Sequence, residues 1–286
     1  MLKTTKRGTF YVILFLALLT ALAPGPAQAE NWLDVADTSW YDEAQTEFTI
    51  STEAQLAGLA KLSSEGTTFE GKTVCLDRDL DLTTKEWTSI GSFLGTFDGR
   101  GHLVKLKAPL FHSAGNTRQP ATLLDLNLSG DIARSCTNAG SVYLASLANT
   151  CFGTIRNCSF TGSIVLEHTY TTGTIPALHL GGIVGTFTAP SAKTGEISGC
   201  RVRARMTTKN NSKKPEAITA YIGGIVCGSS QNVAIRNCVF EGGIHAEEQG
   251  SPPFAFEVIL GGIAAQNVTP TSWRSEERRV GKECRS

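Results

Sequence analysis

One pattern decides the fold, and its clearest copy reads Thr154-Ile-Arg-Asn-Cys-Ser-Phe-Thr-Gly-Ser-Ile164. The other copies are Thr122-Leu-Leu-Asp-Leu-Asn-Leu-Ser-Gly-Asp-Ile132, Glu196-Ile-Ser-Gly-Cys-Arg-Val-Arg-Ala-Arg-Met206 and Ala234-Ile-Arg-Asn-Cys-Val-Phe-Glu-Gly-Gly-Ile244. These four blocks, three of which contain a cysteine, follow one another at steps of 32, 42 and 38 residues. Repeats of this length with unequal insertions are typical of a solenoid, because no single unit can bury its apolar face alone.

The spacing inside a block favours strands over helices. Cys158, Phe160 and Ile164 are separated by even steps, which is the period of a strand whose alternate side chains share a face. Ile155 lies an odd step before Cys158, so the chain must bend at Arg156-Asn157. Two short strands joined by a corner in each unit predict an all-β fold, a parallel β-helix. The usual rule for parallel crossovers predicts that it is right-handed.

Stacked coils would place equivalent apolar residues in continuous interior rows. The predicted rows are Leu123/Ile155/Ile197/Ile235, Leu126/Cys158/Cys200/Cys238, Leu128/Phe160/Val202/Phe240 and Ile132/Ile164/Met206/Ile244.

A glycine-containing block precedes three of the coils, and reads Leu180-Gly-Gly-Ile-Val184 in its first occurrence. We expect the Gly-Gly pairs to adopt backbone angles that a side chain forbids and to let two walls approach closely. A phosphate-binding loop is the alternative, but the G-x-G-x-x-G pattern is absent. Leu144-Ala-Ser-Leu-Ala148 lacks the pair, and Gly199 replaces the Asn of the other corners, so distorted coils are expected there.

These motifs resemble the GLUG-repeat surface proteins of bacteria. The resemblance covers roughly residues 40–267 and rests on Gly181-Gly-Ile-Val-Gly185, the block ending at Ile244 and Gly95-Thr-Phe-Asp-Gly-Arg-Gly-His-Leu-Val104. It implies an exported β-helical stalk or adhesin-like region. Such repeats also occur as accessory parts of IgA-specific metallopeptidases.

Both chain ends are read as segments outside the fold. Residues 1–29 combine Lys3, Lys6 and Arg7 with an apolar run and a small-residue cleavage site, which predicts a secretory signal peptide. Residues 274–286 resemble a translated sequencing adapter. The expected organisation is therefore a signal peptide, a cap with the first coils over residues 30–121, and repeats over residues 122–273, cut in the fifth unit. Within the cap, Ser51 to Leu62 predicts a short amphipathic helix.

The charge balance bears on the class of partner. The whole chain has 26 basic and 26 acidic residues, and leaving out both ends leaves 18 basic against 23 acidic. This negative balance argues against nucleic acid and anionic membranes as partners. We expect a protein that is secreted or on the cell surface, and not integral to the membrane after signal cleavage.

Two sets of charged residues are candidate sites. Asp77, Asp79 and Asp81 alternate along one run, so three carboxylates sharing a face would suit Ca²⁺, with a solvent-facing acidic row as the alternative. Arg201, Arg203 and Arg205 alternate outward and could bind a carbohydrate or a carboxylate. The alternative for Arg203 is an ion pair with Glu241 of the next coil.

Cysteine usage does not indicate a metal or redox centre. Seven cysteines remain when Cys284 is set aside, and no C-x-x-C spacing occurs. Cys158, Cys200 and Cys238 are expected to act as small apolar fillers between coils. The other four could form disulfides, but their spacing does not say how: Cys75, Cys136, Cys151 and Cys227.

The sequence favours a non-catalytic interaction or spacer module, adhesin-like, whose ligand is a host or cell-surface glycan or protein. No histidine begins an H-E-x-x-H motif, the G-x-S-x-G elbow is absent, and no cofactor is implied. Two alternatives are a carbohydrate-active β-helix enzyme and an accessory region of a larger surface protease.

Overall fold

The computed structural model describes residues 30–137, 140–169, 177–191, 193–211, 218–230, 232–248 and 256–267. The predicted signal peptide and the predicted adapter-derived tail lie outside these residues.

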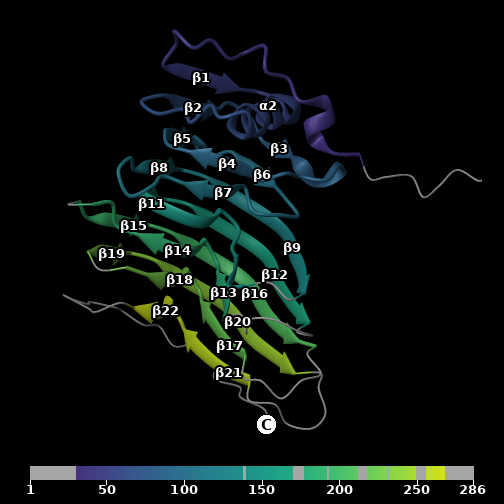
Figure 1. The fold of residues 1–286 in the computed structure, drawn as a ribbon, viewed down its shortest axis with the longest axis vertical. Coiled ribbons are helices and arrows are strands. Elements are labelled where there is room, and N and C mark those ends of the chain that lie inside the picture. The colour runs from purple at the N-terminus through teal and green to yellow at the C-terminus, as the bar shows by residue number, and fades with distance from the viewer. Residues whose placement is uncertain are drawn as a thin grey trace, which may run out of the picture. The chain divides into compact units, whose positions relative to one another are not determined.

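Two coils of the repeat region contain four strands each. One coil consists of β13 (Ala177–Gly181), β14 (Val184–Thr188), β15 (Gly195–Ser198) and β16 (Arg201–Asn210). The next consists of β17 (Ile218–Gly223), β18 (Val226–Ser229), β19 (Val233–Arg236) and β20 (Val239–Glu248), and each strand pairs in parallel with its counterpart. The predicted parallel β-helix is therefore confirmed (Figure 1). Its right-handed sense stays a prediction.

The remaining strands extend the stack on both sides of these two coils (Figure 1). They are β1 (Glu47–Ile50), β2 (Thr73–Leu76), β3 (Leu80–Asp81), β4 (Ile90–Phe93), β5 (Thr96–Asp98), β6 (Leu103–Lys105), β7 (Phe111–Ala114), β8 (Ala121–Leu124), β9 (Asn127–Thr137), β10 (Val142–Leu144), β11 (Ala148–Arg156), β12 (Ser159–Thr169), β21 (Phe256–Gly261) and β22 (Ala264–Asn267). Together with the eight strands of those two coils they form, in the described part, a 12-stranded, a six-stranded and a four-stranded sheet.

The coils widen along the chain. Thr73 pairs with Thr96, Thr96 with Thr122 and Thr122 with Thr154, so successive steps are 23, 26 and 32 residues. The early coils are short because β3 and β6 have only two and three residues, whereas β9 has eleven. They also lack a strand of the four-stranded sheet, β10-β13-β17-β21.

The predicted interior rows are present in the register. Ile155 pairs with Leu123 and Ile197, and Ile197 pairs with Ile235. In the six-stranded sheet, Phe160 pairs with Leu128 and Val202. Ile164 pairs with Ile132 and Met206. Except at the last coil, these side chains are almost completely buried.

In the repeat region, the corner between the 12-stranded and six-stranded sheets contains a left-handed residue. Asp125, Asn157 and Asn237 have φ values of 50°, 51° and 53°, and Gly199 has φ 65°. Asn and Asp tolerate this region better than other side chains, and Gly adopts it freely. The expectation of distortion at Gly199 is therefore wrong, because glycine takes the same conformation as its neighbours in the row.

The Gly-Gly corners depend on close approach, as expected, but not on unusual backbone angles. A Cβ on Gly182 would lie 2.0 Å from the carbonyl oxygen of Gly224. None of these paired glycines has a positive φ, so that part of the expectation is wrong. The block around Leu144 keeps the same register, since Leu144 pairs with Leu180 and Ser146 Oγ donates to the Gly182 carbonyl at 2.6 Å. The expected distortion is not seen in this register either.

The three ladder cysteines stack in successive coils, and each directly follows the left-handed residue of a corner, Asn157, Gly199 or Asn237. Cys158 and Cys200 are each 1% exposed, and the thiol of Cys200 contacts both neighbouring thiols. The Cys158 thiol and burial raise the pKa of Cys200 to about 12. The seven described cysteines are free, and the ladder members lie between the coils as small apolar fillers, as predicted.

A helix covers the narrow end of the stack. The predicted amphipathic helix is α2 (Glu53–Ser64), which begins after the N-cap Thr52 and buries Leu56, Leu59 and Ala60. It packs against β4 and the 3-10 helix η2 (Trp32–Val35), and a second 3-10 helix, η3 (Leu82–Thr84), follows β3. Within the described residues no helix has the length and apolar character needed to cross a membrane.

Candidate interaction surface

The outer side of the six-stranded sheet presents a broad array of polar side chains, called the polar face below. Side chains on β16 alternate between exposed and buried, because successive residues of a strand point to opposite faces. One row crosses all six strands and contains Asp81, Lys105, Ser129, Thr161, Arg203 and Glu241. The register therefore brings together residues from widely separated parts of the chain.

Two of the three candidate arginines are held by the next coil. Arg203 donates from Nε and Nη2 to one Glu241 carboxylate oxygen at 3.1 and 2.8 Å, and Arg201 Nη1 lies 3.6 Å from the other. The hydrogen bonds from Arg203 hold the pKa of Glu241 below its usual range. The predicted cross-coil ion pair is confirmed.

Arg205 differs from its two neighbours. It is exposed on the same face, but no described residue forms an ion pair with its guanidinium. Its row neighbours are Ser163, whose hydroxyl donates to Asp131 at 2.6 Å, and Gly243, which has no side chain. Arg205 is therefore the candidate arginine available to an external anion.

Cross-coil contacts tie the rest of the face together. Ser159 Oγ donates to Asn127 Oδ1 at 2.6 Å, and Ser135 Oγ donates to a Glu167 oxygen at 3.2 Å. Lys209 Nζ lies 3.2 Å from the other Glu167 oxygen. Exposed pairs of this kind each contribute less than about 1 kcal/mol, but they fix side-chain positions on the surface.

The three candidate aspartates do not share a strand face. β2 ends at Leu76 and β3 begins at Leu80, so the chain turns a corner within the run, and the expectation of a common face is wrong. Asp81 accepts from Thr83, which lowers its pKa, and lies 3.3 Å from Lys105 Nζ. Among the described residues no three carboxylate, imidazole or thiol groups converge as metal ligands would.

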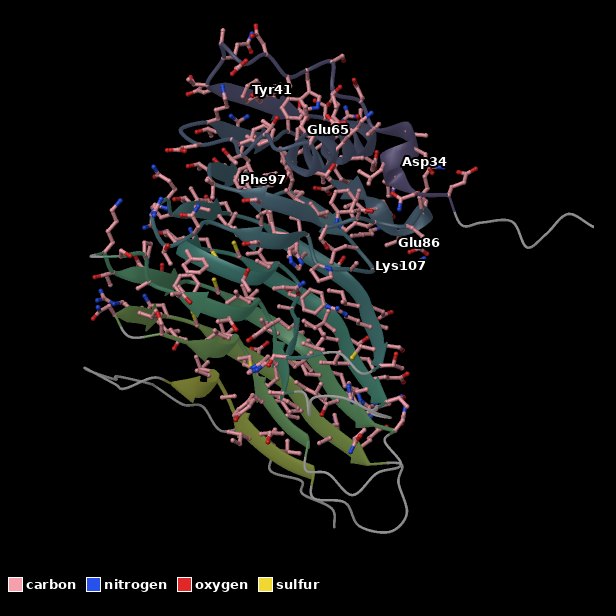
Figure 2. The ribbon with its side chains drawn as sticks, in the orientation of Figure 1. Asp34, Tyr41, Glu65, Glu86, Phe97 and Lys107 are labelled. Carbon is pink, nitrogen blue, oxygen red and sulfur yellow. The ribbon has the colours of Figure 1, made fainter. Side chains whose placement is uncertain are left out.

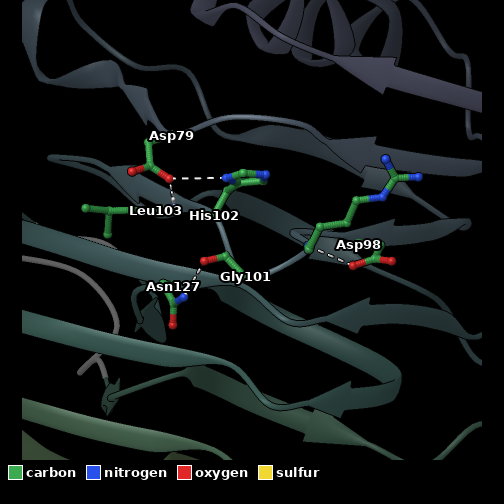
Figure 3. Close-up of polar contacts among 7 residues, drawn as sticks. Asp79, Asp98, Gly101, His102, Leu103 and Asn127 are labelled. Atoms are coloured by element: carbon green, nitrogen blue, oxygen red, sulfur yellow. Dashed lines mark hydrogen bonds and ion pairs between the residues drawn. The ribbon is translucent and has the colours of Figure 1, made fainter.

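Asp79 instead pairs with a histidine of the next coil (Figure 3). Its Oδ1 accepts the Leu103 N–H at 2.9 Å, which lowers its pKa, and lies 3.3 Å from His102 Nδ1. Nearby, Asn127 Nδ2 donates to the Gly101 carbonyl at 2.7 Å. Sequence reasoning did not find this pair. Residues 79 and 102 are one coil step of 23 residues apart, but the early coils carry no repeated motif from which this step could be predicted.

A second arrangement that sequence reasoning did not find lies in the four-stranded sheet. His179 is stacked between Tyr143 and Tyr221, with ring centroids 4.5 and 5.1 Å away, and its Nδ1 lies 3.5 Å from Cys227 Sγ. Burial lowers the pKa of His179 to about 4 and raises that of Cys227 to about 12. The pair is therefore neutral and inaccessible, which suits packing and not nucleophilic chemistry.

The cap carries a shallow hollow. It is lined by Tyr41, Glu43, Lys72 and the turn from Glu65 to Glu70. Figure 2 shows Tyr41 and Glu65 at the end of the stack that α2 covers. Lys72 Nζ is already occupied, because it donates to the Glu43 and Gln45 carbonyls at 2.7 and 2.6 Å.

The fold and surface define a parallel β-helix with a polar outer sheet, and comparisons with known proteins add little to that class. No protein-family model matches the chain, and no curated protein matches it. A solved structure from Bacteroides ovatus, provisionally assigned as an immunoglobulin A1 protease, is 15% identical with a TM-score of 0.35. The match covers 79% of this chain and 85% of that one. The resemblance to GLUG-repeat proteins stays a prediction.

Proposed function

We propose that the chain is a secreted or surface-displayed bacterial interaction and spacer module, adhesin-like and non-catalytic, which contacts its ligand through the polar face. The observation that carries this proposal is Arg205, an exposed cation with no described ion-pair partner on a face whose other charges are largely paired. A guanidinium recognises carboxylates with two parallel hydrogen bonds. The ligand class is an acidic glycan or an acidic protein surface.

The scaffold supports binding because the face is ordered before the ligand arrives. Strands β9, β12 and β16 pair along ten or more residues, and buried rows fix their inner sides. Groups held in place lose little conformational freedom on association, which favours affinity. The hydroxyls of Ser129 and Thr161 lie in the row of Arg203, which is next to the row of Arg205 on the same face, and can complete a polar contact.

Adhesion of protein-coated beads to cells and to immobilised acidic glycans tests the proposal. We expect Arg205→Ser to weaken adhesion about tenfold, which is about 1.4 kcal/mol. The matched control is Arg118→Ser, which removes the same charge from an exposed turn between β7 and β8. Equal adhesion of Arg205→Ser, Arg118→Ser and the unchanged protein would show that Arg205 does not contribute to binding. Absence of adhesion to every surface would count against the proposal itself.

The Asp79–His102 pair favours a second candidate, a carbohydrate-active enzyme. A carboxylate at Nδ1 orients an imidazole and leaves Nε2 to act as a general base. Turnover of a polysaccharide panel that disappears in His102→Ala but persists in His112→Ala would support this candidate. Adhesion without turnover supports the interaction module.

A further inference from the structure

The widening of the coils leaves one strand edge without a neighbour. β9 pairs along its whole length with β12, but on its other side only Asn127–Ser129 pair, with Leu103–Lys105 of β6. The strand of the earlier coil, β6, ends at Lys105, opposite Ser129. Among the described strands none pairs with residues 131–137 on this side. Figure 1 shows this half of β9 at the border of the stack.

Exposure shows that the edge is uncovered by the described residues. Ala133, Arg134 and Ser135 are exposed, whereas Leu166 and Thr208, which follow Arg134 in the same row, are both 0% exposed. The difference comes from position in the stack, because β12 and β16 have neighbours on both sides and β9 does not. A strand edge with unpaired N–H and C=O groups is a template for another strand.

We propose that this edge, residues 131–137, binds an extended acidic peptide segment of another protein, which adds to the six-stranded sheet as a strand. Arg134 selects the acidic character. It stands in an inward row, where the following coils have an apolar and a hydroxyl side chain, and no described carboxylate pairs with it. Its Nη1 makes only a 3.5 Å contact with the Tyr143 carbonyl. An Asp or Glu of the added strand, opposite Arg134 and on its face, would pair with the guanidinium.

A second copy of this chain is a poorer occupant. In a strand pair, directly opposite residues share a face. The residues of the β9 edge on the face of Arg134 are Ile132 and Cys136, and neither is acidic. Asp131 lies on the opposite face and accepts from Ser163. Self-pairing in register would place Arg134 against Ile132, Cys136 or another Arg134. The edge therefore discriminates against itself and in favour of a foreign carboxylate.

The probe is a peptide already known to match the other edge of β9. A fluorescent peptide with the sequence of Ser163–Thr169 pairs in register with residues 131–137 in the fold, with Leu166 opposite Arg134. Two versions carry Leu166→Glu or Leu166→Lys. Fluorescence anisotropy should show at least tenfold tighter binding of the glutamate peptide to the folded chain. Alternate backbone nitrogens of the peptide are methylated along one edge or along the other. Binding should be lost only when the methylated edge is the one whose N–H groups pair with β9.

A charge reversal on the protein separates recognition from fold maintenance. Arg134→Glu should reverse the preference, so that the lysine peptide binds more tightly, while Arg118→Glu leaves the preference unchanged. A purely structural role of Arg134 would produce no reversal. If Arg134→Glu fails to fold by circular dichroism, Arg134→Gln replaces it and should remove the discrimination.

Three outcomes would overturn the inference. They are equal binding of both peptides, no binding of either peptide, and self-association of the chain that Arg134→Glu abolishes. The inference stands apart from the polar-face proposal, because bead adhesion through Arg205 should be the same in Arg134→Glu. If the unchanged protein adheres to the beads but binds neither peptide, this inference alone fails. If it binds the glutamate peptide but does not adhere, the polar-face proposal alone fails.

Discussion

At the scale of the residue, burial decides which substitutions the solenoid tolerates. Ile197 lies in a row that is 0% exposed at Leu123, Ile155 and Ile197. Ile197→Asp places an unpaired carboxylate there, which should destabilise the fold by about 4 kcal/mol or more. Thermal unfolding followed by circular dichroism should show a large fall in Tm. Ser198→Asp, an added charge on the outward neighbour, should change it little, and equal Tm values for both variants would contradict this register.

The glycine corners give a second prediction at this scale. Gly182→Ala would bring a Cβ to 2.0 Å from the Gly224 carbonyl oxygen and to 2.9 Å from Val202. The walls must then move apart, at a cost of about 1 to 3 kcal/mol. Gly140→Ala is the matched control, because nothing lies within 4 Å of its added Cβ. Chemical denaturation should show lower stability for the first variant only.

The buried rows and the corner of the repeat could be predicted from the sequence, because both follow from the spacing of residues within one short block. Even steps within a block predict the buried rows, and the odd step at Arg156-Asn157 predicts the corner. The Asp79–His102 pair depends instead on the length of one early coil. That length could not be predicted, because the early coils contain no repeated motif. The expectation of a shared aspartate face failed because the run Asp77 to Asp81 contains a corner. Alternation within a run describes one face only when the strand is continuous.

At the scale of the element, the four-stranded sheet contains a column of stacked rings with a histidine at its centre. Tyr143, His179 and Tyr221 come from three successive strands, and burial lowers the pKa of His179 to about 4 from 6.5. Sequence reasoning did not find the column, although its members each stand one residue before the aligned blocks that begin at Leu144, Leu180 and Ile222. The column predicts how this sheet responds to acid.

The sign of the acid response follows from the lowered pKa. As the pH falls through 6.5 the unfolded state takes up the proton first, so stability is lost between pH 6.5 and about 4. A shift of this size corresponds to at most about 3 kcal/mol. Urea unfolding at pH 7 and pH 5 should show a smaller loss in His179→Phe than in the unchanged protein. His112→Phe, at an exposed position, should leave the loss as it was.

At the scale of the whole molecule, the described stack has two unlike ends. α2 covers the narrow end, whereas β19, β20, β21 and β22 are the outermost strands at the wide end. Two of the three large apolar side chains that are most exposed in the described part lie there, Val239 at 38% and Leu260 at 51%. Exposed apolar edge strands favour association.

This asymmetry predicts association through the wide end. A chain cut after Asn267 should form concentration-dependent oligomers in sedimentation velocity experiments. Leu260→Lys combined with Val239→Lys should shift the distribution to monomer, because lysines on an edge oppose pairing. Val35→Lys, at the third exposed apolar position and far along the chain from that end, is the control. Monodisperse monomer at high concentration would contradict the prediction.

The order of the coils along the chain also bears on how the molecule is made. The helical lid and the narrow, phenylalanine-filled coils around Phe69, Phe93, Phe97 and Phe111 come first in the sequence. Each later coil contacts its neighbours and needs a finished surface on which to form. A chain that leaves the ribosome or a translocation pore with its amino end first therefore presents α2 and the narrow coils before the later coils that stack on them. The coils can fold during synthesis in the order in which they emerge. Only the strand edges of the most recently formed coil are then exposed at any time.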